Sequence, residues 1–124
     1  MKKSELSVIT SAKKLFSYIT EITAKSPVKF RYSFVTKMHN LGMEIIENLY
    51  YANGISLGDN RRIDYQNKAM VKLKLLDYIC EASKDVTCIT MHQYDYISKE
   101  ILSTLNLLNG WMNSDLKRIE EKKV

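Results

Sequence analysis

Four stretches of this chain carry apolar residues spaced three or four positions apart, which places them on one face of an α-helix. We place these helices at about residues 4–25, 28–53, 61–84 and 90–113. Connections this short favour antiparallel packing of neighbouring helices. With only four glycines and one proline, the chain has too little turn chemistry for a β-rich domain. The sequence therefore predicts an all-α protein, an antiparallel up-down-up-down four-helix bundle in a single domain, residues 1–124.

Residues near the expected helix ends support these boundaries. Ser26-Pro27 should end the first helix and start the second, with the serine as N-cap and the proline in the first turn. Thr90 and Gln93 have the spacing of a capping box at the start of the fourth helix. Residues 117–124 form a charged tail, which we expect to fray.

The second and third helices carry more apolar surface than one core stripe requires. Because a lone bundle exposes one face of each helix, such a surplus favours self-association, although wide stripes also occur in monomers. Within the second helix Gly42 weakens the helix slightly, and a close helix crossing would explain its presence. The surplus comes from Ile46, Tyr50, Val71, Leu75 and Tyr78.

Several classes of protein are disfavoured. No stretch approaches the ~18 apolar residues of a membrane span, and two cysteines do not make a disulfide framework, so we expect a cytoplasmic protein. No nucleophile motif, phosphate loop or di-iron pair is present, and we therefore expect neither an enzyme nor a cofactor. A zinc site would need Cys80, Cys88, His92 and His39 to converge; buried thiols and two ordinary histidines are the simpler interpretation. We expect no metal.

Basic residues are more informative. The formal net charge is +5, which permits a polyanionic partner without requiring one. Arg61, Tyr65, Lys68 and Lys72 are spaced four, three and four apart, so they share a helix face beside the core stripe. We place Arg61, Arg62, Lys68 and Lys72 on the outer part of the third helix. A basic stripe that includes an aromatic residue suits phosphate contact together with base stacking.

A second basic run lies around the first connection and contains no acidic residue. It comprises Lys25, Lys29, Arg31 and Lys37. The third helix ends in Asp77, Glu81 and Asp85, close to where an antiparallel second helix would begin. The alternative to nucleic-acid binding is therefore that the two helices neutralise each other.

Residues in a familiar order run along nearly the whole chain, and together they resemble the Avd family, the accessory variability proteins of diversity-generating retroelements. The residues that carry this resemblance are Ser26-Pro27, Phe30-Arg31, Asn40-Leu41, Glu47-Asn48-Leu49-Tyr50, Ala52-Asn53, Arg62, Tyr65-Gln66, Lys68-Ala69, Cys88-Ile89, Gln93-Tyr94, Leu107-Leu108, Gly110-Trp111, Asn113-Ser114-Asp115 and Lys117-Arg118.

The resemblance implies a four-helix bundle that assembles into a five-fold ring with a basic surface and has no catalytic activity of its own. Such a protein binds the retroelement's reverse transcriptase and the template-repeat RNA, and the enzyme then makes cDNA with errors at adenines. Family basic residues match here at Arg31, Arg62, Lys68 and Arg118. The related family encoded in intervening sequences of large-subunit ribosomal RNA genes shares the bundle.

Three interpretations follow. The first is an adaptor that binds a reverse transcriptase and its RNA as a homopentamer. Its expected nucleic-acid or partner-binding residues are Arg31, Arg61, Arg62, Tyr65, Lys68, Lys72 and Arg118. The second is an RNA- or DNA-binding bundle that has no polymerase partner. The third is an oligomeric scaffold whose charge serves only solubility.

Overall fold

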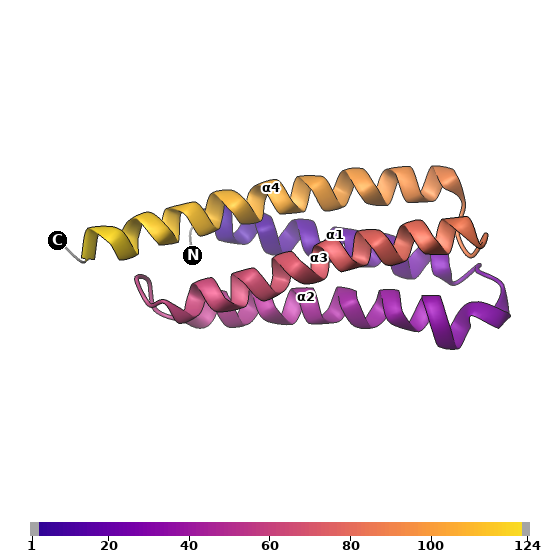
Figure 1. Ribbon diagram of the computed structural model, residues 1–124, viewed down its shortest axis with the longest axis horizontal. Helices are drawn as coiled ribbons and strands as arrows, with labels where there is room; N and C mark the ends of the chain where they lie inside the picture. Colours follow the sequence, from indigo (N-terminus) through magenta and orange to yellow (C-terminus); the bar gives the residue numbers. More distant parts are fainter. Residues whose placement is uncertain (1–2, 123–124) are drawn as a thin grey trace.

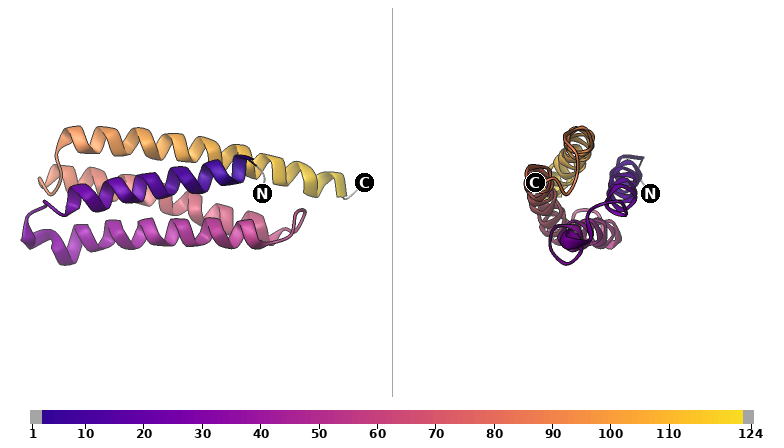
Figure 2. Two further views of the ribbon diagram at one scale, coloured as in Figure 1. Left: turned by 180° about the vertical axis from the view of Figure 1, so that it is seen from behind. Right: turned by 90° about the vertical axis from the view of Figure 1, so that its right-hand side faces the viewer.

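Four long α-helices make up the protein, as the computed structural model shows for residues 3–122. They are α1 (Lys3–Thr23), α2 (Thr36–Gly54), α3 (Arg61–Asp85) and α4 (Met91–Lys122). Each helix runs antiparallel to the next, and α4 returns to pack against α1 as well as α3 (Figure 1). Viewed end on, the helices surround one central axis (Figure 2). The predicted all-α four-helix bundle is confirmed.

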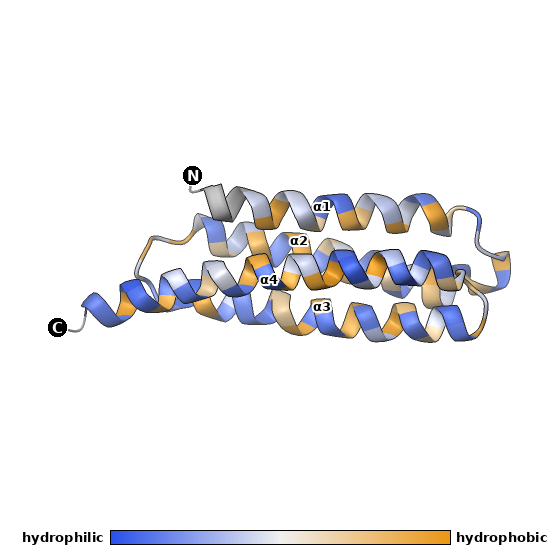
Figure 3. Cartoon of the chain, turned by 90° about the horizontal axis from the view of Figure 1, so that it is seen from above, coloured by the Kyte–Doolittle hydropathy of each residue, from blue (hydrophilic) through white to orange (hydrophobic). Residues whose placement is uncertain are grey.

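The core consists of one apolar face from each helix. Hydrophobic and hydrophilic residues alternate around the helices in the pattern expected of amphipathic elements (Figure 3). Close packing of these faces supplies most of the stability of such a bundle, because burying an aliphatic or aromatic side chain contributes about 1.5–3 kcal/mol. The largest fully buried apolar side chains are those of Trp111, Ile19, Met38, Ile45, Leu49, Leu73, Leu76, Ile97 and Leu108.

Gly42 lies where α2 crosses α1 closely, as its place within a helix predicted. A Cβ atom at this position would stand 2.3 Å from Cδ1 of Phe16, much nearer than any normal van der Waals contact. The missing side chain therefore lets the Phe16 ring lie against the α2 backbone. The close crossing that we predicted at Gly42 is confirmed.

The connection between α1 and α2 differs from the prediction. The chain forms a 3₁₀ turn, η1 (Val28–Phe30), and a wider π turn, η2 (Arg31–Val35), before regular helix begins at Thr36. Ser26 is not an N-cap: its hydroxyl donates instead to the carbonyl oxygen of Cys88, at 2.7 Å. This bond ties the connection to the turn between α3 and α4. Helical turns do follow Pro27, but they begin as η1 and η2 and become regular α-helix only at Thr36.

The structure confirms the predicted start of α4 but not its predicted end. The capping box is confirmed, because the Gln93 side chain accepts from the Thr90 N–H at 2.9 Å and Thr90 Oγ1 accepts from the Gln93 N–H at 3.0 Å. The predicted end at residue 113 is wrong, since α4 continues to Lys122 through most of the expected tail. Asp115 is buried in the bundle and anchors these turns. Residues 123 and 124 of that tail lie outside the described residues.

Candidate nucleic-acid interface

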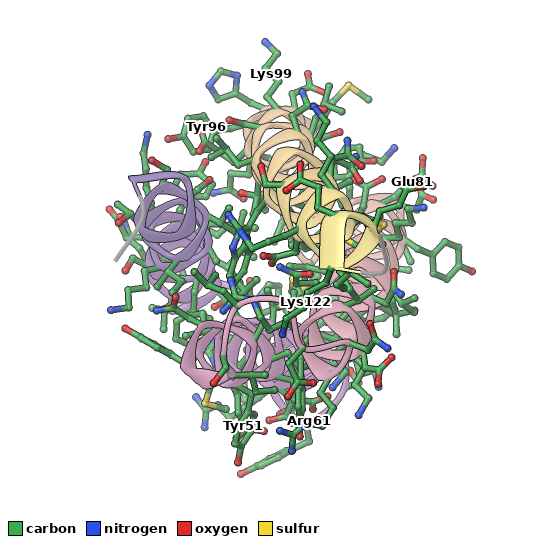
Figure 4. All side chains as sticks on the ribbon, turned by 90° about the vertical axis from the view of Figure 1, so that its left-hand side faces the viewer. Tyr51, Arg61, Glu81, Tyr96, Lys99 and Lys122 are labelled. Carbon is green, nitrogen blue, oxygen red and sulfur yellow. The ribbon has the colours of Figure 1, made fainter. Side chains whose placement is uncertain are left out.

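The predicted basic face of α3 is present as one side of the helix. Arg61 and Lys68 are exposed there, and Tyr65 and Lys72 are half-buried. Figure 4 shows Arg61 and the neighbouring Tyr51 projecting from the same side of the bundle. The spacing therefore predicted the shared face correctly. Its charges are available to a ligand only where they are not already paired within the protein.

Arg61 is held by a carboxylate in the turn that precedes α3. Its Nη2 donates to Oδ2 of Asp59 at 2.8 Å, and its Nε donates to Oδ1 at 3.2 Å. The backbone N–H of Arg61 also donates to Oδ1 of Asp59, at 2.9 Å. The side-chain hydrogen bonds from Arg61 are the main cause that lowers the pKa of Asp59 from 3.8 to about 2. The pair is therefore charged at neutral pH, and a phosphate would have to compete with Asp59.

The rest of the α3 face is also engaged. Lys72 Nζ lies 3.1 Å from Oε1 of Glu44 on α2. The ring of Tyr65 stacks on that of Tyr51 with 5.1 Å between centroids and an angle of 25° between the planes. The Lys68 ammonium lies 4.8 Å from the centre of the same Tyr65 ring. A base that stacked on Tyr65 would have to displace one of these two contacts.

Arg62 does not lie on the outer part of α3, and that prediction is wrong. Its side chain is 2% exposed, and its Nε donates to Oδ2 of Asp115 at 3.1 Å. Its Nη1 donates to the backbone carbonyls of Ala52 at 3.1 Å and Ile55 at 2.7 Å. The guanidinium also lies over the Trp111 ring, 5.4 Å from its centre. Arg62 therefore joins α3, α4 and the end of α2 from inside the bundle.

Asp115 collects further donors around this buried charge. Nη1 of Arg118 donates to Oδ1 of Asp115 at 2.6 Å, and Nε2 of Gln66 donates to Oδ2 at 2.8 Å. The partner that a buried Gln66 requires is thus Asp115. Arg118, which the family resemblance assigned to the basic surface, is half-buried and paired. Arg62 and Arg118 both serve the interior in this structure.

A different group of cations remains without carboxylates, at the turn between α1 and α2. We call it the α1–α2 corner: Lys25, Lys29, Arg31, Tyr32 and Lys37, all of them exposed. No acidic residue occurs between Glu21 and Glu44 in the sequence. Among the side chains of residues 7–122, none of the four cations has a carboxylate oxygen within 4.0 Å, so the proposed neutralisation by the acidic end of α3 is not seen as ion pairs.

The side chains of the corner combine positive charge with aromatic and apolar surface. Tyr32 is 88% exposed and Val28 is 69% exposed. The Lys29 ammonium lies 5.1 Å from the centre of the Phe30 ring. The corner occupies the end of the bundle where α1 turns into η1 and η2 (Figure 1). Cations beside an exposed tyrosine are the combination that proteins use to bind single-stranded nucleic acid.

A cavity of about 360 Å³ opens beside Arg31 at this corner. The end of α1, the connecting turns and the first turns of α2 form its walls. We call it the corner cavity, and its lining residues are Thr20, Thr23, Ala24, Ser26, Pro27, Val28, Arg31, Val35, Thr36 and His39.

Apolar residues are also exposed along the outer side of α3. Val71 is 64% exposed and Tyr78 is 63% exposed, with Leu75 between them at 39%. Their spacing of four and three places them in a line, which we call the α3 apolar stripe. On α4, Leu102 is 60% exposed and lines a groove with Lys74 of α3. Such a line of apolar residues is typical of a surface that another protein covers.

Clustered metal ligands and membrane spans are both lacking in the part of the chain that the structure describes. Among the side chains of residues 7–122, no three His, Cys, Asp or Glu residues are grouped so that they could hold a metal ion. Burial raises the pKa of the Cys80 thiol to about 12, which keeps it protonated. None of the helices described is both long enough and apolar enough to cross a bilayer.

Comparison with known proteins supports the fold. The chain matches no protein-family model and no curated protein. It is similar to a crystal structure from Bacteroides thetaiotaomicron VPI-5482, of a protein with unknown function from the S23 ribosomal protein family. The TM-score is 0.74 at 17% sequence identity, and the match covers 89% of this chain and 98% of the other. A likeness at this identity concerns the fold alone.

Sequence reasoning identified the four cations of the corner as an acid-free basic run, but it named only Arg31 as a binding residue and missed Tyr32. The available signal was the length of the acid-free run, from residue 22 to residue 43. The burial of Arg62 also had a signal, because it continues the core register of α3 toward the N-terminus. The buried positions there are Arg62, Gln66, Ala69, Leu73, Leu76, Cys80 and Ser83, spaced four and three in turn.

Proposed function

We propose that this protein is a non-enzymatic accessory protein of a diversity-generating retroelement, which binds the reverse transcriptase and its template-repeat RNA to support mutagenic cDNA synthesis. The ordered residues that resemble the Avd family support the choice of system. The observation that carries the RNA part is the α1–α2 corner, where four exposed cations have no carboxylate within 4.0 Å among the side chains of residues 7–122.

We prefer the corner to the α3 face as the RNA-binding surface because its cations are not paired with carboxylates in the part of the chain that the structure describes. Binding to nucleic acid draws much of its free energy from counterions that the phosphates release when cations replace them. A cation that is already paired must first give up its carboxylate, so Arg61 with Asp59 and Lys72 with Glu44 offer less than unpaired cations do. Lys25, Lys29 and Lys37 therefore take the role that we first assigned to α3, together with Arg31.

The RNA proposal is tested by removing four positive charges from the corner in one variant and four from elsewhere on the surface in another. In the corner variant, Lys25, Lys29, Arg31 and Lys37 are replaced by glutamine. In the control variant, Lys13, Lys74, Lys99 and Lys117, which are also exposed, are replaced by glutamine. Both variants lose four charges, so a difference between them reports position and not net charge.

Fluorescence anisotropy with a labelled single-stranded RNA, repeated over a series of salt concentrations, measures the effect. We expect the corner variant to lose about three units of slope in log affinity against log salt, at about 0.7 per phosphate contact. The control variant should keep most of the parent's slope. Equal losses in the two variants would mean that binding follows net charge, and the corner would no longer be the interface.

The polymerase part of the proposal requires the native cell. A tagged copy should recover a reverse transcriptase and a specific RNA, both identified after purification. Recovery of RNA with no polymerase would favour the alternative of an RNA- or DNA-binding bundle that acts without one. Whether the adjoining gene encodes a reverse transcriptase is a cheaper observation on the same point.

A second candidate function is an oligomeric scaffold, and the α3 apolar stripe favours it. Val71, Leu75 and Tyr78 are exposed in the single chain and would be covered in an assembly. We also propose self-association, with five protomers as the family resemblance implies, as part of the adaptor function. The scaffold alone would remain if the protein assembled but recovered neither RNA nor polymerase.

A further inference from the structure

The corner cavity is lined on one side by hydroxyl groups that already donate their protons to backbone carbonyl oxygens. The hydroxyl of Thr20 donates to the carbonyl oxygen of Phe16, and that of Thr36 donates to the carbonyl oxygen of Arg31, each at 2.5 Å. Thr23 donates to the carbonyl oxygen of Ile19 at 2.7 Å. A hydroxyl has one proton and two lone pairs. These three side chains therefore present only acceptors to anything that enters the cavity.

The hydrogen-bonding role of the His39 ring is set by its contact with Thr23. The distance from Thr23 Oγ1 to Nε2 of His39 is 2.8 Å. We assign the proton of Thr23 to the carbonyl of Ile19, so that Nε2 is the donor in this contact and, in the neutral ring, Nδ1 is an acceptor. The hydroxyls and the imidazole of the lining are thus all hydrogen-bond acceptors, which favours a ligand with N–H donors.

Arg31 and the apolar lining set the remaining properties of that ligand. Arg31 is the one cation among the lining residues, and it has no carboxylate partner within the described chain. Pro27, Val28 and Val35 add apolar surface. The volume of about 360 Å³ lies at the small end of ligand sites, which begin at about 300 Å³. A flat, partly apolar group with an N–H edge and an attached anion fits these properties, and one nucleotide has them all.

We propose that the corner cavity holds one unstacked base of a single-stranded RNA, that it prefers bases with an exocyclic amino group, and that Arg31 binds the adjoining phosphate. This inference rests on the proposed function, because it assigns a base site within the same corner. Single strands suit the site because their bases can leave the stack and enter a pocket, whereas those of a duplex cannot. Tyr32, beside Arg31, offers a neighbouring base a stacking surface.

Cytosine and uracil test the proposal with almost no difference in size. Cytosine carries an amino group with two N–H donors where uracil carries a carbonyl acceptor, and the one donor on the same edge of uracil is N3–H. A wall of several acceptors should therefore favour cytosine. We expect oligocytidylate to bind about threefold to tenfold more tightly than oligouridylate of equal length, the range that one net hydrogen bond supplies. Fluorescence anisotropy at neutral pH measures both affinities.

Two substitutions with matched controls place that preference in the cavity. Ala24→Phe fills the cavity from its lining just after α1, and Ser17→Phe adds the same ring at an exposed position of α1 that does not line the cavity. Thr20→Val removes one acceptor without changing shape, and exposed Thr10→Val is its control. We expect Ala24→Phe to abolish the preference for cytosine and to keep the salt slope, and Thr20→Val to reduce the preference. The controls should keep both properties.

The outcomes separate this inference from the proposed function. Equal affinity for the two RNAs, or a preference that survives both Ala24→Phe and Thr20→Val, would overturn the base site and leave the corner as a general phosphate surface. If free cytidine monophosphate displaced the RNA at concentrations near the RNA's own Kd, the site would be one for free nucleotides and the assignment to a strand would fall. Failure of the parent to bind any RNA at low salt would overturn both proposals.

Discussion

Arg62 and Asp115 form an ion pair inside the bundle, with 3.1 Å between Nε and Oδ2 and with side chains 2% and 1% exposed. The pair joins the first turn of α3 to the C-terminal part of α4. Through Nη1 the same guanidinium also binds the last turn of α2 and the loop after it. One charged side chain thus holds three segments of chain together, and its neighbour Arg61 holds only a surface turn.

Replacing Arg62 with methionine should lower the free energy of unfolding by about 3–5 kcal/mol, because Asp115 would keep a buried charge without its main partner. Arg61→Met is the matched control, and at this exposed position we expect little change in the free energy of unfolding. Urea unfolding followed by circular dichroism measures both. Similar values for the two variants would show that the buried pair contributes no more than the surface one.

The glycines in α2 and α4 should respond in opposite directions to the same substitution. Gly42→Ala would place a Cβ 2.3 Å from Cδ1 of Phe16, and we expect a loss of about 1–3 kcal/mol from overpacking. Gly110→Ala meets nothing within 4 Å, and it should add about 0.5–1 kcal/mol because alanine restricts the unfolded chain and favours helix. Thermal unfolding reports both. A stabilising Gly42→Ala would contradict the close crossing.

The two tyrosines of the candidate interfaces should differ in their effect on RNA binding. Tyr32→Ala should weaken binding by about 1–3 kcal/mol with the salt slope unchanged, as expected where a base stacks on an exposed ring. Tyr65→Ala should change the affinity much less, since its ring already contacts Tyr51 and Lys68. Anisotropy titrations of the two variants decide between the surfaces, and the reverse order would return the interface to α3.

Self-association should depend on the α3 apolar stripe. At micromolar concentration we expect sedimentation to give several times the 14.4 kDa of one chain, with five protomers as the assembly. Replacing Val71, Leu75 and Tyr78 with serine should reduce that mass toward the monomer. The control replaces Met43, Leu57 and Met91 with serine; they are also exposed, and the change should leave the assembly intact. A parent that stays monomeric would remove this role from the stripe.

The sequence predicted the bundle because its signals are local. Apolar spacing, the capping box of Thr90 and Gln93, and Gly42 each depend on residues within a few turns of one another. The end of α4 depends on a contact between distant residues, Asp115 with Arg62, which no local rule contains. The connection before α2 likewise contains a bond between distant residues, Ser26 and Cys88.

The candidate site was harder to predict because spacing locates charges but not their partners. Arg61, Lys68 and Lys72 do share a face, yet Asp59 and Glu44, which lie on other segments, occupy two of them. Arg62 shows the converse, since a basic residue usually signals surface and its acceptor lies 53 positions away. The corner was visible as an acid-free run, but its exposed Tyr32 and its cavity required the folded chain.

The hydrogen bond from Ser26 to Cys88 also has a consequence for the order in which the protein is made. Its two residues are 62 positions apart, so this bond cannot form until the turn after α3 has left the ribosome. A nascent chain that ended before that turn would already contain Lys25, Lys29, Arg31 and Lys37. It would lack the hydrogen bond between Ser26 and Cys88, so the corner with this bond in place forms only late in synthesis.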